Sequence, residues 1–441
     1  MPGAASPTAA SAPSASPEAC GSLRGRPCGC APASHAELAR QGRHDVTGST
    51  GAGPLAGIRV VEIATFIAAP GGAHLLASQG ADVIKVEDLV VGDPLRMFGS
   101  SRGGMSGWFA NINAGKRSLA MDIASPQGRE LMADLLATAD VFVQAYRPGV
   151  AERLGIGEAD VRKRNPDVIY VSISGFGRDG PYSKRPAYDA VIQGWSGIAA
   201  VQGGDGEPQF VKSFIPDKVT SLTWTQAVCA ALFARERTGR GEHVELSLLD
   251  SAVSFMWPDA MMDHTVLSDD ADHRPNLLAD YRLLACRDGY VAMMPLTDAH
   301  WKGVADAFSR PDLLTDPRFA EAGPRAAHFG DMIDTLGDVV ADVGRDDVVE
   351  RLIAADVPVA PALRPDEIAA DPQVQHSGVV REVDHPIVGP IRQHRPAALF
   401  AGGTPELRHA VERGADTDQI LRELGRSPAA IAELRADGIV K

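Results

Sequence analysis

The sequence has few cysteines and no long apolar segment. Five cysteines occur in 441 residues. That is too few for a disulfide framework at this length, so we expect reduced thiols. No apolar run approaches the roughly 18 residues of a membrane span. The first residues also lack the basic and apolar regions of a secretory signal. The composition therefore predicts a cytoplasmic protein without a membrane partner.

Positive charge is also scarce. Lysine and arginine number 43 against 57 acidic residues, which gives a net charge of −14. This balance argues against nucleic acid as a partner, because such proteins carry basic surfaces. It does not exclude an anionic small molecule, which needs only a local basic patch. With 44% hydrophobic and 23% charged residues, the composition is that of an ordinary globular enzyme.

Residues 1–52 are rich in Ala, Ser, Pro and Gly. Such a segment buries too little apolar surface to offset the entropy of ordering it, so we expect a disordered tail. Within it, Cys20, Cys28, Cys30 and His35 form a candidate set of zinc ligands. Their spacing matches no common zinc motif, and Cys-x-Cys is cramped for a tetrahedral site. The sequence therefore predicts no metal centre.

The globular part begins near residue 53, where apolar runs alternate with helical patterns. We expect strands at 57–64 and 81–87 around a helix at 70–80, then a helix at 126–140 and a further strand within 165–177. Repeated strand–helix–strand units imply a parallel sheet covered by helices. The prediction is an α/β fold with a large domain at 53–255.

The pattern changes after residue 255. We expect a linker at 256–280 and a smaller α+β domain at 281–365. The small domain would contain two strands around an Arg-Asp-Gly turn within 281–295. A C-terminal segment, 366–441, would return to the large domain and end in two short helices separated by Gly425.

Several catalytic motifs are missing. The turn after the first strand, ATFIAAPGGAH, cannot be written as G-x-G-x-x-G, although Glu87 stands where an acid would bind a ribose. Walker A, His-Glu-x-x-His and Cys-x-x-Cys motifs do not occur, and the segment SISGFG is not a nucleophile elbow. The residues therefore give no support to a P-loop enzyme or a zinc protease, and SISGFG gives none to a serine hydrolase.

Basic residues cluster near expected strand ends: Lys116, Arg117, Arg147 and Arg153. One interpretation is ordinary solvated surface charge. The other is a phosphate-binding rim, since ligands of open α/β sheets lie at the carboxyl ends of the strands.

An aspartate follows a proline in the segment SFIPDKVTSL, residues 213–222. The residues after it predict an amphipathic helix, with Val219, Leu222, Cys229, Leu232 and Phe233 on or near one face. Asp217 is then a candidate N-cap. The alternative is a chemical role, and the two roles are compatible because helix N–H groups orient a carboxylate.

Seven ordered motifs resemble class III CoA-transferases, a family that also holds formyl-CoA transferase, carnitine CoA-transferases and α-methylacyl-CoA racemase. The resemblance extends from about residue 54 to the C-terminus. The motifs are PLAGIRVVEIATFIAAPGGAHLLASQGADVIKVE, GDPLR, NAGKRSLAMDI, RPGVAERLG, NPDVIYVSISGFGRDGPYSKRPAYD, PDKVTS and RTGRGEHVELSLLDS.

The resemblance implies a Rossmann-like large domain, a small domain and an interlocked homodimer. It makes Asp217 the nucleophile that attacks an acyl-CoA thioester before CoA passes to a carboxylic acid. No metal or permanently bound cofactor is required; coenzyme A enters as the substrate thioester. The four basic residues become candidates for CoA phosphate contacts, Arg153 foremost, and Tyr188 and Asp189 are expected to shape the acyl-CoA pocket.

Two other functions stay open. An acyl-CoA racemase or isomerase, including one that moves CoA within a single dicarboxylic acid, belongs to the same family. The racemases use a His and an Asp. Here Asp189 keeps the acid within AYD, but residues 151–188 contain no histidine. A third possibility is a catalytically silent CoA-binding protein.

Overall fold

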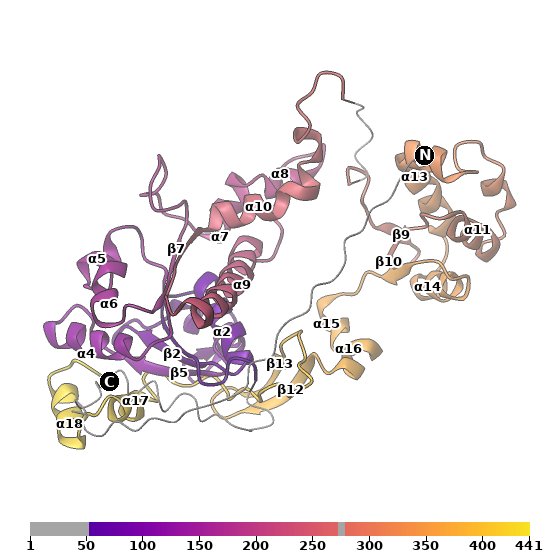
Figure 1. Cartoon of the computed structure of the whole chain (residues 1–441). Helices are drawn as coiled ribbons and strands as arrows, with labels where there is room; N and C mark the ends of the chain where they lie inside the picture. The colour runs from indigo at the N-terminus through magenta and orange to yellow at the C-terminus, as the bar shows by residue number, and fades with distance from the viewer. Residues whose placement is uncertain (1–52, 272–277) are drawn as a thin grey trace, which may run out of the picture. The chain divides into compact units, whose positions relative to one another are not determined.

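The computed structural model describes residues 53–271 and 278–441 (Figure 1). The predicted tail at 1–52, with its candidate zinc ligands, lies outside the described residues. Residues 272–277 of the predicted linker also lie outside the described residues.

Six parallel strands form the central sheet. Their order across the sheet is β5-β2-β1-β6-β7-β8. In chain order this is 3-2-1-4-5-6, the arrangement of dinucleotide-binding folds, and the direction of winding reverses between β1 and β6. The predicted α/β class with a parallel sheet is confirmed. The strands are β1 Arg59–Ile63, β2 Asp82–Glu87, β5 Lys116–Ala120, β6 Val141–Gln144, β7 Ile169–Ser174 and β8 His243–Ser247.

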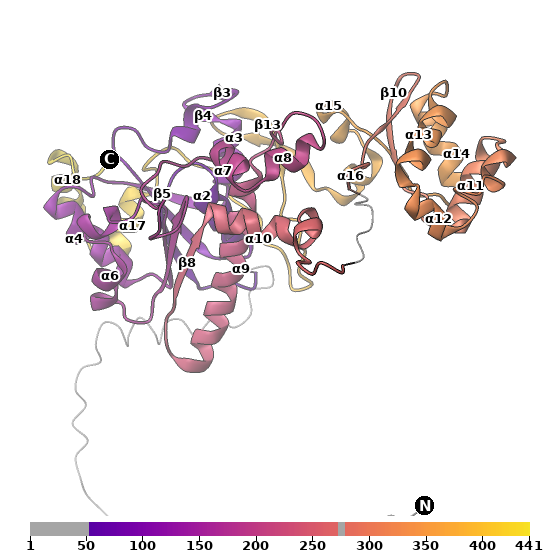
Figure 2. The same ribbon diagram turned by 90° about the horizontal axis from the view of Figure 1, so that it is seen from above.

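Helices cover both faces of this sheet, and each face has its own apolar core (Figures 1 and 2). One core is formed with α2 Ala68–Ser78, α7 Asp189–Trp195, α8 Ile198–Gly203, α9 Ile215–Thr238 and α10 Leu248–Ala260. The other is formed with α4 Pro126–Ala137, α5 Val150–Arg153, α6 Glu158–Arg164, α17 Thr417–Glu423 and α18 Pro428–Ala436. The C-terminal helices thus complete the core of the large domain. Gly425, at φ +79°, separates them as predicted.

Residues 284–357 build a separate apolar core. A three-stranded antiparallel sheet, in the order β11-β10-β9, packs with short helices there. The elements are β9 Leu284–Cys286, β10 Gly289–Met293, α11 Asp298–Ala307, η3 Pro311–Leu314, α12 Ala322–Ala327, α13 Phe329–Val340, α14 Arg345–Ala354 and β11 Val359–Pro361. The hairpin expected within 281–295 is present. The domain boundaries placed at 255, 280 and 365 stay predictions.

A second hairpin, β12 Val380–His385 and β13 Gly389–His394, packs on a helix of the large domain, α3 Gly107–Ile112. Nδ2 of Asn111 donates to the carbonyl of Arg392 at 3.4 Å. The remaining elements are η1 Pro94–Met97, β3 Ser101–Arg102, β4 Met105–Ser106, η2 Met262–His264, α15 Pro365–Ile368 and α16 Pro372–Ser377.

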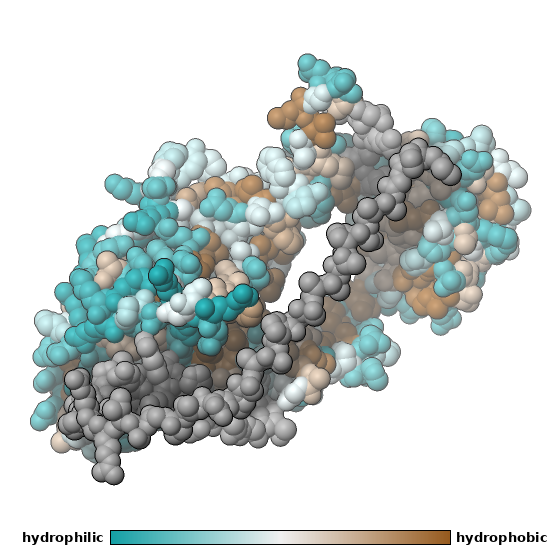
Figure 3. All heavy atoms as spheres, in the orientation of Figure 1, coloured by the Kyte–Doolittle hydropathy of each residue, from teal (hydrophilic) through white to brown (hydrophobic). Residues whose placement is uncertain are grey.

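Among the described residues, no helix combines the length and the apolar character that crossing a membrane would need. The same residues contain no group of three or more His, Cys, Asp or Glu side chains suited to a metal ion. Hydrophobic side chains nevertheless reach the surface in patches between hydrophilic ones (Figure 3). The exposed aromatic residues include Trp195, Phe255 and Trp257.

Candidate active site

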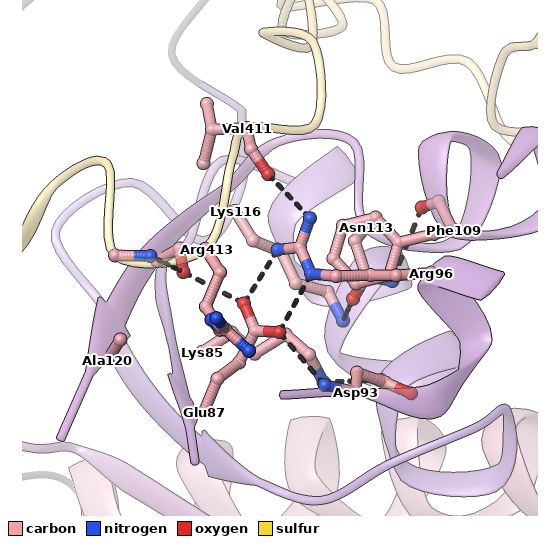
Figure 4. A network of polar contacts seen from close by, with 12 residues as sticks. Lys85, Glu87, Asp93, Arg96, Phe109, Asn113, Lys116, Ala120, Val411 and Arg413 are labelled. Atoms are coloured by element: carbon pink, nitrogen blue, oxygen red, sulfur yellow. Dashed lines mark hydrogen bonds and ion pairs between the residues drawn. The ribbon is translucent and has the colours of Figure 1, made fainter. Parts of the chain in front are cut away.

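A buried network of charges supports the loop after β1, and Figure 4 shows the part of this network around Glu87 and Arg96. Nζ of Lys85 lies 2.7 Å from Oε1 of Glu62 and 3.0 Å from Oδ2 of Asp93. The other oxygen of Glu62 lies 2.7 Å from Nζ of Lys116. Burial alone would raise the pKa of Glu62, but the two ammonium groups outweigh it, so this pKa is lowered. Buried charges of this kind are tolerated only when paired.

Arg96 extends the network to the end of β2. Its Nη2 and Nε lie 2.7 and 3.0 Å from the two carboxylate oxygens of Glu87, a bidentate pair. Burial of Glu87 opposes ionisation, yet its bond with Arg96 and the charge of Lys85 lower its pKa to about 2. Glu87 is therefore a structural anion here, held by Arg96.

The network fixes an unusual backbone conformation at Phe66. Lys85 donates to the carbonyl of Ala64 at 2.8 Å, and the N–H of Phe66 donates to Oδ1 of Asp93 at 3.2 Å. Phe66 has φ +64°, in the left-handed region that is costly for a bulky residue. Its ring meets that of Tyr188 edge-on at 5.8 Å. No sequence signal marks Phe66 as a member of the site.

Two predicted phosphate ligands are already paired. Besides Glu62, Nζ of Lys116 bonds the carbonyl of Pro70 at 2.7 Å and Oδ1 of Asn113 at 2.9 Å. Burial lowers the pKa of Lys116 to about 8 even though Glu62 opposes the shift. Arg117 bonds Asp82 and Glu423, with its shortest contacts at 2.6 and 2.7 Å. Contact of either residue with a CoA phosphate stays a prediction, and these pairings favour a structural role.

Arg147 and Arg153 lie beyond β6 and are exposed. Neither side chain forms an ion pair or hydrogen bond within the described part of the chain. Both guanidinium groups thus keep their charge available to an anion. They are the two of the four predicted basic residues that the structure leaves free.

A cavity of about 160 Å³ lies at the point where the winding of the sheet reverses. Open α/β folds bind ligands at this point. Residues at the ends of β1, β2 and β6 line it, together with Tyr146. Glu87 and Asp93 on its wall are paired with cations of the network. Asp88 accepts the N–H groups of Val90 and Val91, each at 2.8 Å, and is given no cation among the described residues. The lining residues are Ile63, Ala64, Thr65, Val86, Glu87, Asp88, Gly92, Asp93, Met121, Ile123, Ala145 and Tyr146.

Asp217 lies in the first turn of α9 rather than at its cap. The helix begins at Ile215, and the N-cap residue is Phe214, whose side chain makes no cap bond. The predicted N-cap role of Asp217 is therefore wrong. The reason is Pro216, which fits the second position of a helix because its missing N–H needs no partner there. The helix consequently starts three residues earlier than expected, with its N-cap at Phe214 instead of Asp217.

The carboxylate of Asp217 is buried and accepts no hydrogen bond from the described part of the chain. The residue is 9% exposed, and no described residue donates a hydrogen bond to either carboxylate oxygen. Burial, followed by the nearby charge of Asp189, raises its pKa to about 7. A carboxyl group with shifted pKa and free oxygens is typical of a functional site.

Asp189 holds the segment that leads into Asp217. Its Oδ2 accepts the backbone N–H of Asp217 at 3.2 Å, and its Oδ1 accepts Nε2 of Gln193 at 2.7 Å. Gln193 in turn bonds the N–H of Val211 at 2.9 Å and the carbonyl of Ser213 at 3.1 Å. Burial raises the pKa of Asp189. The structure thus brings Tyr188, Asp189 and Asp217 together.

Close packing of α9 on α2 fixes the helix that carries Asp217. The indole N–H of Trp224 donates to the carbonyl of Ala68 at 3.0 Å. A Cβ added at Gly72 would lie 2.2 Å from the ring of Trp224, so the contact needs glycine. The predicted apolar face is wrong in part, because Leu222 and Phe233 are 60% and 65% exposed. The buried face instead includes the polar residues Thr220, Ser221 and Thr225.

Comparison with known proteins identifies the family. The model of CoA-transferase family III matches residues 55–417. The chain belongs to CoA-transferase family III. It is a CoA-transferase.

Relatives in the family support this assignment. An acyl-CoA transferase of Fusarium pseudograminearum is 30% identical over 89% of both chains. A succinyl-CoA:mesaconate CoA-transferase of Haloarcula hispanica is 31% identical over 76% of this chain and 86% of its own. The crystal structure of a CAIB/BAIF family protein from Brucella suis has a TM-score of 0.74 and 31% identity. It is matched over 84% of this chain and 99% of that one.

Proposed function

We propose that the enzyme moves CoA from an acyl-CoA thioester to a carboxylic acid through a covalent intermediate on Asp217. The observation that carries this proposal is the buried carboxylate of Asp217, next to Asp189, with no hydrogen bond from residues 53–271 or 278–441 to either oxygen. A hydrogen-bonded or ion-paired carboxylate would have to give up those bonds before attacking. Asp217 has none to give up among the described residues.

The reaction balances without a redox partner or a metal. A carboxylate oxygen of Asp217 attacks the thioester carbon, the C–S bond breaks, and CoA leaves as a thiolate. The thiolate then attacks the aspartyl carbonyl of the mixed anhydride and releases the donor acid. The acceptor carboxylate attacks the resulting aspartyl thioester, forming a second anhydride and freeing CoA again. Attack of this thiolate on the acceptor acyl carbon yields the product and regenerates Asp217.

Burial of Asp217 supports two parts of this scheme. It raises the free energy of the ionised nucleophile, and it keeps water away from anhydrides that would otherwise hydrolyse. The bond from the N–H of Asp217 to Asp189 holds the first turn of α9 in place, so Asp189 acts as a positioning residue. Tyr188, the residue before Asp189, packs edge-on against the ring of Phe66.

We propose that CoA enters at the crevice where the winding reverses, with its phosphates near Arg147 and Arg153. Three features support this placement: the cavity at the switch point, the free charge of both guanidinium groups, and the sequence motif that contains Arg153. In this proposal Lys116 and Arg117 have a structural role: their ion pairs hold β5, the strand at one edge of the sheet. No metal or permanently bound cofactor is needed by the chemistry.

We also propose a homodimer that works in the cytoplasm. Exposed aromatic side chains on α7 and α10, among them Trp195 and Trp257, support a protein interface on these helices. Light scattering of the full chain tests the proposal. A mass of one chain over a wide concentration range would contradict it.

The covalent step is tested by peptide mass spectrometry. The full chain is mixed with a panel of acyl-CoA thioesters, alongside Asp217→Ala and the control Asp250→Ala, which alters an exposed first-turn acid of α10. A CoA or acyl adduct on the peptide with Asp217, present in wild type and the control, is expected. An altered thioester or α-deuterium without any adduct would instead indicate an isomerase. Tight binding with neither adduct nor turnover would indicate a silent CoA-binding protein.

A further inference from the structure

The wall of the cavity at the switch point carries acids and no cation. The described residues that line it include Glu87, Asp88 and Asp93 and no Lys, Arg or His. Glu87 is held by Arg96 and Asp93 by Lys85 (Figure 4). Asp88 has no such cation among the described residues. A phosphate group is bound by cations or N–H donors, so this wall does not suit a phosphate.

Asp88 follows β2 directly and is exposed. Its Oδ1 accepts the backbone N–H groups of Val90 and Val91, each at 2.8 Å. Such a turn fixes the orientation of the side chain. Its Oδ2 accepts no hydrogen bond from residues 53–271 or 278–441. Because a carboxylate oxygen is only an acceptor, a ligand that bonds this atom must offer a hydroxyl or an amino group.

Tyr146 lines the same cavity from the other side of β1, since it follows β6, and β2 and β6 flank β1. Its backbone N–H donates to Oε1 of Gln144 at 2.9 Å, while its phenol oxygen forms no hydrogen bond within the described part of the chain. Burial, followed by the charge of Asp88, raises the pKa of Tyr146. The phenol therefore keeps its proton, lies within electrostatic range of Asp88, and can both donate and accept.

The size of the cavity limits what it can hold. Its volume of about 160 Å³ is well below the roughly 300 Å³ of a pocket that encloses a whole small ligand, so it suits a single ring. Arg147 is the next residue after Tyr146, and Arg153 belongs to α5; both are exposed, and neither lines the cavity. This arrangement separates an uncharged, hydroxyl-bearing part of a ligand from its charged phosphates.

We propose that Asp88 is a specificity-determining residue, which accepts a hydrogen bond from a ribose hydroxyl of CoA beside the phenol of Tyr146 and disfavours a phosphate on that ribose. The proposal rests on the proposed entry of CoA at this crevice. In dinucleotide-binding folds, an acid about 20 residues beyond the first strand–helix turn bonds the ribose hydroxyls, whereas an arginine accommodates a ribose phosphate. Asp88 takes the place of that acid because Glu87, the last residue of β2, is already held by Arg96. Acyl thioesters of 3′-dephospho-CoA are then a further substrate class.

Equilibrium binding tests this contact without any need for turnover. Calorimetry on the full chain compares CoA with 3′-dephospho-CoA, which differ only in the phosphate on the ribose. We expect the wild type to bind dephospho-CoA at least as tightly as CoA. Asp88→Asn keeps an oxygen for the N–H groups of Val90 and Val91 but removes the charge. It should shift the ratio of the two dissociation constants in favour of CoA by at least about fivefold, the effect of a like charge about 4 Å away in water.

The matched control is Asp371→Asn. Oδ1 of Asp371 accepts the N–H groups of Gln373 and Val374, each at 2.9 Å, in the same kind of turn, and Asp371 does not line the cavity. The ratio should keep its wild-type value in this variant. Tyr146→Phe, which retains the ring, should weaken the binding of dephospho-CoA by about two- to tenfold, as expected for the loss of one neutral hydrogen bond.

Tighter binding of CoA than of dephospho-CoA by the wild type would overturn the proposal. So would a ratio that Asp88→Asn leaves unchanged or that Asp371→Asn shifts equally. Circular dichroism of each variant checks its fold. The adduct on Asp217 separates this proposal from the proposed function. If the adduct forms but the ratio ignores Asp88, the ribose contact is wrong and the covalent scheme stands; if the ratio follows Asp88 and no adduct forms, the covalent scheme is wrong and the ribose contact stands.

Discussion

The backbone N–H of Asp217 bonds Oδ2 of Asp189 at 3.2 Å, while the side chains of both residues are acidic and buried. Asp189 therefore affects Asp217 in two ways. Through the backbone it holds the first turn of α9, and through its charge it disfavours ionisation of the Asp217 carboxyl. This relationship supports the proposed roles, in which Asp189 positions the first turn of α9 and Asp217 reacts.

The transfer rate should depend on the ionisation of Asp217. Its pKa is raised to about 7, so the nucleophilic carboxylate is lost below that pH. We expect kcat/KM to fall about tenfold per pH unit below about 7 and to level off above it. Measurement of kcat/KM between about pH 5 and about pH 9 tests this. A profile flat down to pH 5 would show that this carboxyl titrates much lower or does not react.

Asp189→Asn should shift that profile towards acid. The asparagine oxygen can still accept the N–H of Asp217, but the negative charge that raises the pKa of Asp217 is gone. We expect the acid limb of kcat/KM to move down by up to about one pH unit. Asp189→Ala, which also loses the hydrogen bond, should lower kcat as well. An unmoved limb in Asp189→Asn would exclude electrostatic coupling between the two acids.

Asp217→Asn should stabilise the fold at neutral and alkaline pH. The folded pKa of about 7 lies above the ordinary value of 3.8, so the folded state binds more protons in between. Stability of the wild type should then fall as pH rises from about 4 to about 7, by about 1.4 kcal/mol per unit of pKa difference. The uncharged variant should lack this loss. Denaturant unfolding at pH 5 and at pH 8 compares the free energy of unfolding of Asp217→Asn with that of the wild type. If the variant were more stable by the same amount at both pH values, burial of the charge would not be the cause.

The sequence predicts local features of this fold well and long-range pairing poorly. Apolar runs located β1 and β2, and Gly425 separated α17 from α18, because strand cores and helix ends depend on nearby residues. By contrast, the ion pair of Lys116 with Glu62 joins residues 54 positions apart. Nothing local distinguishes that lysine from an exposed one. The buried face of α9 was missed for the same reason, since its polar residues bond the backbone of α2.

Arg153→Gln should weaken CoA binding without affecting chemistry. Its guanidinium has no partner within the part of the chain that the structure describes, and a charge-assisted bond to phosphate contributes about 1.5–3 kcal/mol. We expect the KM for acyl-CoA to rise at least about tenfold while kcat at saturation stays near wild type. An acyl-pantetheine thioester, which lacks the nucleotide phosphates, should be used equally by variant and wild type. The control Arg240→Gln changes another exposed arginine; a loss of the same size there would mean that general charge, not position 153, is responsible.

Gly72→Ala should disturb the active site from a distance. The added methyl group would lie 2.2 Å from the ring of Trp224, a residue that is fully buried and bonded to α2. Because α9 must shift to make room, we expect a loss of about 1–3 kcal/mol in stability and a lower kcat, since Asp217 lies two turns away on the same helix. The matched control is Gly337→Ala in α13, where the added Cβ meets nothing within 4 Å. That change should stabilise slightly, as alanine favours a helix over glycine. If Gly72→Ala destabilised the protein and left kcat unchanged, the contact of α2 with Trp224 would support the fold without orienting the nucleophile.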